Sequence, residues 1–498
     1  MERPSRAGNS SRDAITGNLS MAVIRLHTLF LVVVAAWCTQ AIADQVLPPK
    51  AIRDDFKQLY ESLQSAHFDL YISRSRADYD RAFDEVSATL NQPMKRADVI
   101  KAFQKFVALG NVAHARVEST DATFSDHLAA GGGLLPLSVR IIAERIFVVE
   151  YLGSDSRLVA GDEIVQIDNA PAATVLERLR AHLSADTKHL ADTMMEHQFP
   201  QLLWQEFGER DAYTMVVRDS KDSEVNLRIE PVSLQQAREN ASLKKTGLGL
   251  SWSAREARIL PDGTAYLRPG PFYNVEGNET WDTTGFAKFI DDSFRDFIES
   301  EVSNLLIDLR NNPGGDATFS DLMIAWFADR PFRFYSEFKI KVSQEAQASN
   351  ATRIDGDDTH WVTRAYAREF ANRAAGEIFS FQMPFVSPRE DARFDGNVFV
   401  LVNRHSYSNA VTVAAILQDY GFATILGEET ADLASTLGAM EHFSLQNTGI
   451  QVGFPKARIV RPNGDPARRG VVPDILIHTP VVETSDDPVL SEALALTR

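Results

Sequence analysis

Ser408 has the sequence context of an oxygen nucleophile. The segment Val400-Leu-Val-Asn-Arg-His-Ser-Tyr-Ser-Asn-Ala-Val predicts a buried strand that breaks at polar residues and passes into a helix. Ser408 would then be exposed near a helix N-terminus, where the next backbone N–H, that of Asn409, can point at a developing oxyanion. The alternative is that Ser408 only caps the helix beginning near Ala410, which is a common role for serine.

A second motif has the composition of a backbone anion site. Leu306-Ile-Asp-Leu-Arg-Asn-Asn-Pro-Gly-Gly-Asp predicts a buried strand that runs directly into a turn containing Gly314 and Gly315. Glycines let the backbone approach a ligand closely and turn its N–H groups outward, as an oxyanion site requires. Taken alone, the same residues also fit an ordinary turn.

These two motifs belong to a region in which strand-like and helix-like segments alternate. Such alternation predicts an α/β core whose helices cover a sheet. The expected strands are 265–268, 304–309, 397–402 and 423–426, and the expected helices are 283–299, 322–327 and 410–420. Residues 328–396, which are polar and partly acidic, are expected to form an insertion or a lid.

The N-terminal half has a different pattern. Met21 opens a segment with a basic residue, a short apolar run and a small-x-small site, which predicts a secretory signal cleaved after Ala43. From 48 to 117, apolar residues recur at helical spacing. A β-rich stretch follows, in which residues 161–169 and the helix-like 172–183 resemble a peptide-binding PDZ module.

Composition excludes several classes of protein. The 498 residues carry a formal net charge of −17, which repels phosphate backbones and disfavours nucleic acid as a partner. The single cysteine, Cys38, lies in the predicted signal, so we expect a mature chain without disulfides or thiol chemistry. No spacing of histidine and acidic residues resembles a metal site, and we expect neither a metal nor a cofactor.

Five ordered blocks resemble the C-terminal processing, or tail-specific, serine proteases. After the two motifs above come Gln418-Asp-Tyr-Gly, Ile425-Leu-Gly-Glu-Glu-Thr and Gly470-Val-Val-Pro-Asp-Ile. The resemblance implies a crotonase-like α/β core in which Ser408 is the nucleophile. It also implies an oxyanion hole made by the backbone N–H of Gly314 or Gly315 together with that of Asn409.

The resemblance also predicts the organisation of the chain. We expect a leader and signal peptide (1–43), an N-terminal helical domain (44–118), a PDZ-like domain (119–185), a connecting segment (186–245), the catalytic core (246–480) and a C-terminal tail (481–498).

The sequence departs from the family at the general base. The positions of the processing proteases' lysine and its supporting glutamine are Leu433 and Leu437, and the next lysine, Lys456, lies in a different segment. The predicted branch is therefore the one that lacks this lysine.

His114 is the candidate base instead. It lies in Leu109-Gly-Asn-Val-Ala-His-Ala-Arg, which looks like the histidine block of the branch resembling the tricorn core protease and the retinoid-binding-protein repeats. A neutral imidazole can accept a serine proton near neutral pH. Without the resemblance, a lone histidine is more simply a structural residue, as we expect for His405.

An acidic residue should orient the imidazole, and three candidates remain open. These are Glu428, Glu429 and Asp465.

The sequence thus predicts an exported, periplasmic or extracellular serine peptidase that acts on a protein or peptide, without a stable membrane anchor. Two alternatives are a non-catalytic binding relative and a serine hydrolase acting on non-peptide esters.

Overall fold

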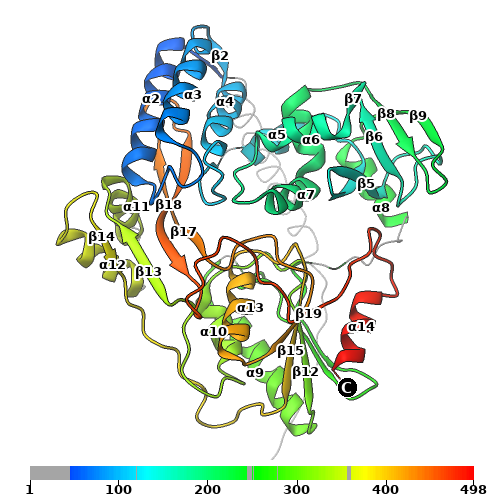
Figure 1. Cartoon of the computed structure of the whole chain (residues 1–498), viewed down its shortest axis with the longest axis vertical. Helices are drawn as coiled ribbons and strands as arrows, with labels where there is room; N and C mark the ends of the chain where they lie inside the picture. Colours follow the sequence, from blue (N-terminus) through cyan, green and yellow to red (C-terminus); the bar gives the residue numbers. More distant parts are fainter. Residues whose placement is uncertain are drawn as a thin grey trace, which may run out of the picture.

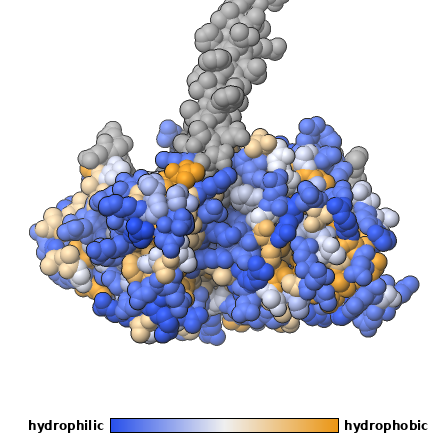
Figure 2. Space-filling model, turned by 90° about the horizontal axis from the view of Figure 1, so that it is seen from above, coloured by the Kyte–Doolittle hydropathy of each residue, from blue (hydrophilic) through white to orange (hydrophobic). Residues whose placement is uncertain are grey.

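The computed structural model describes residues 45–118, 120–243, 250, 252–277, 279–355 and 361–497. The predicted leader and signal, residues 1–43, and Cys38 lie outside this part. Within these ranges, no helix combines the length and the apolar character needed to span a membrane. Figure 1 shows a helical body and a β-rich body above a larger α/β body. Figure 2 shows that hydrophilic residues cover most of the face seen from above.

The helical body is built on aromatic packing. Its elements are β1 (Val46–Leu47), α2 (Pro49–Ala66), α3 (Arg76–Thr89), β2 (Met94–Lys95), α4 (Arg96–Ala108) and β3 (Arg116–Val117). A capping box between Ser75 and Asp78 starts α3. Phe56 of α2 stacks on Phe83 and Phe103 of the neighbouring helices, which fixes α4 and therefore the loop that follows it.

The β-rich body is one antiparallel sheet with two covering helices. The strand order is β4-β5-β6-β8-β9, and β7 pairs with β6. Its elements are α5 (Thr120–Ala129), β4 (Leu137–Ile142), β5 (Arg145–Tyr151), β6 (Glu163–Ile167), β7 (Ala170–Pro171), α6 (Ala172–Arg180), α7 (Lys188–Phe207), β8 (Tyr213–Arg218), β9 (Glu224–Ile229) and α8 (Leu234–Leu243). Leu176 of α6 and Phe199 of α7 pack with the apolar side chains of the strands.

The α/β body has a six-stranded sheet of order β10-β11-β12-β15-β16-β19, parallel from β11 onward. Its strands are β10 (Glu256–Ile259), β11 (Ala265–Arg268), β12 (Asn304–Asp308), β15 (Asn397–Val402), β16 (Thr424–Gly427) and β19 (Ile475–Leu476). Its helices are α9 (Thr284–Glu299), α10 (Ala317–Ile324), α13 (Asn409–Tyr420) and α14 (Pro488–Leu496). Side chains of α9, α10 and α13 pack on one face, and α14 covers the other (Figure 1).

A second antiparallel sheet pairs β3, which follows the helical body, with strands from the C-terminal half of the chain. Its order is β14-β13-β18-β17, and β3 also pairs with β18. Its elements are β13 (Glu337–Lys341), α11 (Gln344–Asp355), α12 (Trp361–Ala371), β14 (Ile378–Ser380), β17 (Thr436–Ser444) and β18 (Gln451–Val460). Residues 328–396 therefore do not form a separate lid, because β13 pairs with β18 along four residues.

A buried polar cluster joins the β-rich body to the α/β body. Glu196 of α7 accepts a hydrogen bond from the Ile141 N–H and lies 3.2 Å from Arg404 and 3.0 Å from His405. Arg404 and His405 immediately precede the Ser408 turn, so this contact anchors α7 beside that turn. The predicted α/β class is confirmed as a mixed α/β fold with several sheets.

Candidate active site

Ser408 occupies a strained turn between β15 and α13. Its backbone has φ 54° and ψ −121°, a conformation that residues other than glycine rarely adopt. Although Ser408 is at the N-cap position, its side chain makes no capping hydrogen bond, so the capping interpretation is wrong. Its backbone N–H donates instead to Asp432 Oδ2 at 2.7 Å. The hydroxyl is therefore not committed to the helix that it precedes.

The Gly314–Gly315 turn lies against this serine. A Cβ on Gly314 would lie 2.6 Å from the Asn409 nitrogen and 2.8 Å from Ser408 Cβ, and one on Gly315 would lie 2.2 Å from the Phe272 carbonyl oxygen. Both glycines also have positive φ, 85° and 137°. Only glycine fits at either position. Because glycine has no side chain, the two motifs can lie in direct contact.

The hydrogen bonds of this turn distinguish the two glycines. The Gly314 N–H donates to Asn312 Oδ1 at 2.9 Å and is therefore occupied. Within the described part of the chain, the N–H groups of Gly315 and Asn409 make no hydrogen bond. Of the alternatives considered from the sequence, Gly315 with Asn409 therefore offers the available pair of donors.

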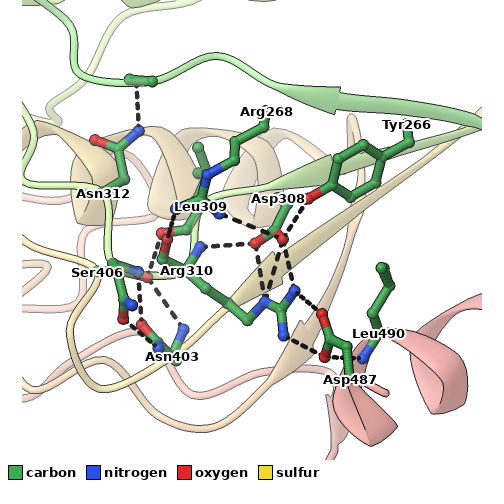
Figure 3. Close-up of polar contacts among 12 residues, drawn as sticks. Tyr266, Arg268, Asp308, Leu309, Arg310, Asn312, Asn403, Ser406, Asp487 and Leu490 are labelled. Atoms are coloured by element: carbon green, nitrogen blue, oxygen red, sulfur yellow. Dashed lines mark hydrogen bonds and ion pairs between the residues drawn. The ribbon is translucent and has the colours of Figure 1, made fainter. Parts of the chain in front are cut away.

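A buried ionic network holds the chain at the end of β12, shortly before the glycine turn (Figure 3). Arg310 contacts Asp308 at 2.7 Å and Asp487 at 2.8 Å, and all three residues are buried. Burial raises the pKa of Asp308, but the charge and hydrogen bonds of Arg310 outweigh it and leave the pKa below its ordinary value. Tyr266 donates to the same carboxylate at 2.8 Å, so the end of β12 is rigidly held.

Direct hydrogen bonds tie the glycine turn to the serine turn. Asn403 accepts from the Asn311 N–H at 3.1 Å and donates to the Asn311 side chain at 2.8 Å. Ser406 Oγ donates to the Leu309 carbonyl at 2.8 Å, and the Tyr407 N–H donates to the Asn312 carbonyl at 2.9 Å. Figure 3 shows Asn403 and Ser406 beside these contacts.

His114 lies in the loop between α4 and β3. Asp186 accepts a hydrogen bond from the Ala113 N–H at 2.9 Å and pairs with Arg468 at 2.7 Å. Ala113 also packs in a small apolar cluster with Ala431 and Tyr407, which brings the histidine loop to the serine turn. Nδ1 of His114 is buried and has no hydrogen-bond partner in the described residues.

Asp432 is the acidic residue that the structure places at this junction. It is buried, and burial raises the pKa of its carboxyl, while the nearby charge of His114 acts in the opposite direction. Its Oδ2 accepts from Ser408, whereas Oδ1 is buried without a hydrogen-bond partner in the described residues. The Asp432 carboxyl therefore contacts the serine backbone and lies near enough to His114 for the charge of the imidazole to act on it. In the residues that the structure covers, each of the two side chains has one buried atom without a hydrogen-bond partner.

The sequence analysis did not name Asp432. The sequence offers only a weak indication of its role, namely that Asp432 directly precedes Leu433, the position aligned with the family lysine. Leu433 and Leu437 are both buried. Lys456 is also buried, pairs with Glu441 and lies 3.8 Å from the centre of the Tyr366 ring, so it is committed to the second sheet.

The predicted acidic candidates have other neighbours. Glu428 accepts from the Arg404 N–H at 3.3 Å and lies 3.9 Å from Arg140. The contact of Glu429 is through its backbone carbonyl, which accepts from His189 at 3.4 Å.

Asp465 lies in an accessible loop, where it pairs with Arg469 at 3.1 Å. His405 lies against Glu196, and burial lowers its pKa to about 3, which fits its expected structural role. The arrangement thus brings Ser408, Gly314, Gly315 and Asn409 together, with His114 and Asp432 beside them.

This arrangement has the parts needed for acyl transfer. It offers a hydroxyl, a nearby imidazole, a buried carboxyl group and two backbone N–H groups that make no hydrogen bond within the described ranges. No group of three histidine, cysteine or acidic side chains that could hold a metal ion occurs in the residues covered by the structure.

Comparisons with known proteins agree with this geometry. Residues 273–477 match the model of peptidase family S41. No curated protein matches the sequence closely.

Two solved structures of mature CPAF share the fold, and the chain is also similar to a third solved structure. The crystal structure of mature CPAF is 17% identical, with a TM-score of 0.59 over 86% of this chain and 92% of that chain. Mature CPAF complexed with lactacystin is 16% identical, with a TM-score of 0.60 over 90% and 97%. The photosystem II D1 C-terminal processing protease is 18% identical, with a TM-score of 0.42 over 86% and 93%.

Proposed function

We propose that this chain is a serine-type peptidase whose S41-family region carries the nucleophile, Ser408. One observation carries the proposal: a strained serine, free of its capping role, lies in contact with a glycine turn that leaves two backbone donors available. Strain of this kind persists only where the surrounding structure enforces it, and it is concentrated at active sites.

In the proposed reaction, Ser408 Oγ attacks the carbonyl carbon of a peptide bond and its proton passes to His114. The carbonyl oxygen becomes an oxyanion, which the N–H groups of Gly315 and Asn409 stabilise. A donor of this kind contributes about 10²–10³ in rate. His114 then protonates the leaving amine, and water, activated by the same imidazole, hydrolyses the acyl-enzyme.

We propose Asp432, rather than Glu428, Glu429 or Asp465, as the acidic residue that acts with His114. Its carboxylate would fix the Ser408 backbone and stabilise the imidazolium that forms when His114 accepts the proton. Support comes from the 2.7 Å bond to the Ser408 N–H and from the nearby charge of His114, which lowers the pKa of the Asp432 carboxyl against the effect of burial.

Several finer features remain part of the proposal. We assign the chain to a branch that lacks the catalytic lysine, because buried Leu433 and Leu437 occupy the aligned positions. We further propose a crotonase-like core, a PDZ-like role for the β-rich body in holding peptide, tail-specific cleavage and export through the predicted signal. The same two leucines favour one alternative, a non-catalytic relative that binds peptide.

A labelling experiment tests the proposal. The purified protein is treated with a fluorophosphonate probe beside Ser408→Ala and His114→Ala. We expect covalent labelling of the wild type, none of Ser408→Ala and slow labelling of His114→Ala. Absence of label on the wild type, or equal labelling of Ser408→Ala, would contradict the assignment.

Two further measurements refine the result. A large gain of activity in Leu433→Lys would indicate a lysine pocket and remove His114 from the mechanism. Peptides with free and blocked C-termini, compared with simple esters, distinguish a tail-specific peptidase from an esterase.

A further inference from the structure

Two adjoining cavities lie between the helical body and the β-rich body. Their volumes are about 370 Å³ and 270 Å³, within the range of ~300–1,000 Å³ for ligand sites when taken together. They share Gln104, His182 and Gln205 as lining residues. We call the pair the α4–α7 groove, because these helices form its two walls and α5 contacts both of them (Figure 1).

One end of the groove is lined by residues close in sequence to Ser408 and His114. The larger cavity is lined by Tyr407, which directly precedes Ser408, and by Arg116, two residues after His114. The smaller cavity continues away from them to His127 and Trp204. A polypeptide whose scissile bond lies at Ser408 could therefore continue along this groove.

The lining of the larger cavity favours uncharged side chains. Most of its lining is uncharged, namely Val117, Leu183, Met194, Leu202, Ser184 and several glutamines. Two histidines, His182 and His197, also line it, and burial lowers the pKa of each to about 4, so both are neutral near pH 7. Two charged residues, Arg116 and Glu118, also line it, but they pair with each other at 3.1 Å. A charged substrate side chain would lose its hydration here without gaining an unpaired counter-charge, which is costly.

We propose that the α4–α7 groove binds the extended polypeptide substrate, and that its larger cavity selects an uncharged, apolar side chain close to the scissile bond. This inference rests on the proposed function, because Ser408 defines where the cleaved bond lies. The Gln198 amide can donate to and accept from the backbone of an extended chain whatever its sequence. The apolar side chains then provide the selectivity.

Gln198 provides a direct test, because it lies half-buried on α7 and lines the larger cavity. Gln198→Glu adds a negative charge and Gln198→Lys a positive one at nearly constant size. The matched control is Gln347→Glu, a half-buried glutamine on α11 outside the groove. All are made in the Ser408→Ala chain for binding and in the wild-type chain for cleavage.

The binding probes are three fluorescein-labelled decapeptides of neutral sequence with a central leucine, lysine or glutamate, measured by fluorescence anisotropy. We expect the leucine peptide to bind best to the parent and to the Gln347→Glu control. Gln198→Glu should shift the preference at least about fivefold toward the lysine peptide, and Gln198→Lys toward the glutamate peptide. Equal preferences in all four proteins would overturn the groove assignment.

Cleavage of an unstructured peptide library, read by mass spectrometry, gives an independent result. The charge preference introduced at Gln198 should occur at one fixed position relative to the cleaved bond. A binding shift without any cleavage would support the groove and contradict the peptidase proposal. Cleavage whose charge preference does not change would contradict the groove and leave the peptidase proposal intact.

Discussion

Asp432→Asn separates the electrostatic role of Asp432 from its structural role. The amide has nearly the same shape as the carboxylate and can still accept the hydrogen bond from the Ser408 N–H, which is 2.7 Å long. What it loses is the negative charge beside His114. When asparagine replaces the aspartate of a Ser-His-Asp triad, kcat falls about 10⁴-fold.

We therefore expect the rate of fluorophosphonate labelling to fall about 10²–10⁴-fold in Asp432→Asn. This corresponds to about 3–5 kcal/mol in the activation barrier, at 1.36 kcal/mol for each factor of ten. We set the smallest expected loss at about 10²-fold because, in the described residues, Asp432 Oδ1 makes no hydrogen bond to the imidazole.

The free energy of unfolding of Asp432→Asn should not fall, although its labelling rate does. Burial raises the pKa of Asp432, so the folded protein binds more protons than the unfolded chain between the two pKa values. The free energy of unfolding contributed by this group therefore falls as pH rises through that window. Asp432→Asn removes the contribution, and its urea midpoint at pH 7.5 should equal or exceed that of the wild type.

The matched control is Asp465→Asn, whose carboxyl lies in an accessible loop beside Arg469. We expect its labelling rate to stay within about threefold of the wild type, since it leaves the Ser408 environment unchanged. If Asp432→Asn labels within threefold of the wild type, the reasoning is refuted. If instead Asp465→Asn shows the large loss, the acidic role belongs to Asp465.

Three other substitutions test the support of the site. Gly315→Ala should lower the free energy of unfolding by about 1–3 kcal/mol and abolish labelling, because the new Cβ would lie 2.2 Å from the Phe272 carbonyl oxygen. The control is Gly376→Ala, which also has positive φ but has open space around it, and it should retain labelling. Arg310→Met should cost about 3–5 kcal/mol in urea unfolding, because it removes the cation that pairs with both buried carboxylates and leaves Asp308 with the longer ionic contact to Arg268 at 3.4 Å; an unchanged midpoint would refute this. Ser408→Gly should be more stable than Ser408→Ala by about 1 kcal/mol or more, since glycine accepts φ 54° without strain; equal midpoints would show that the turn stores no strain.

Local patterns were sufficient to predict the parts of the site that lie within one motif. Ser408 and the Gly314–Gly315 turn each follow a buried strand, and burial on both faces produces the apolar runs of β12 and β15. The choice between the two glycines was not accessible, because it depends on the Asn312 side chain occupying the Gly314 N–H. The rotamer of the Asn312 side chain decides that contact, and a sequence pattern does not predict a rotamer.

Contacts between distant segments were not predictable in the same way. Asp432 acquires its position only when the chain after β16 packs beneath the Ser408 turn, and nothing in its neighbouring residues indicates this. Residues 328–396 were expected to form an insertion or a lid because their pattern is polar and partly acidic. The pairing of β13 with β18, a strand that begins more than a hundred residues later, makes part of them a sheet instead.

The strained serine and the distant histidine depend on the same long-range contacts. Val117, three residues after His114, pairs with Val452 in β18, and Asp186 of the β-rich body binds the histidine loop through the Ala113 N–H. Ser408 in turn keeps its unfavourable φ because Asp432 holds its N–H and Gly314 lies against its Cβ. The histidine loop and the Ser408 turn are held by different bodies. Weakening the contacts between those bodies would therefore displace the base from the nucleophile while leaving both motifs folded. The free energy of docking between the bodies, rather than the stability of any one of them, therefore determines how much of the protein has a complete site.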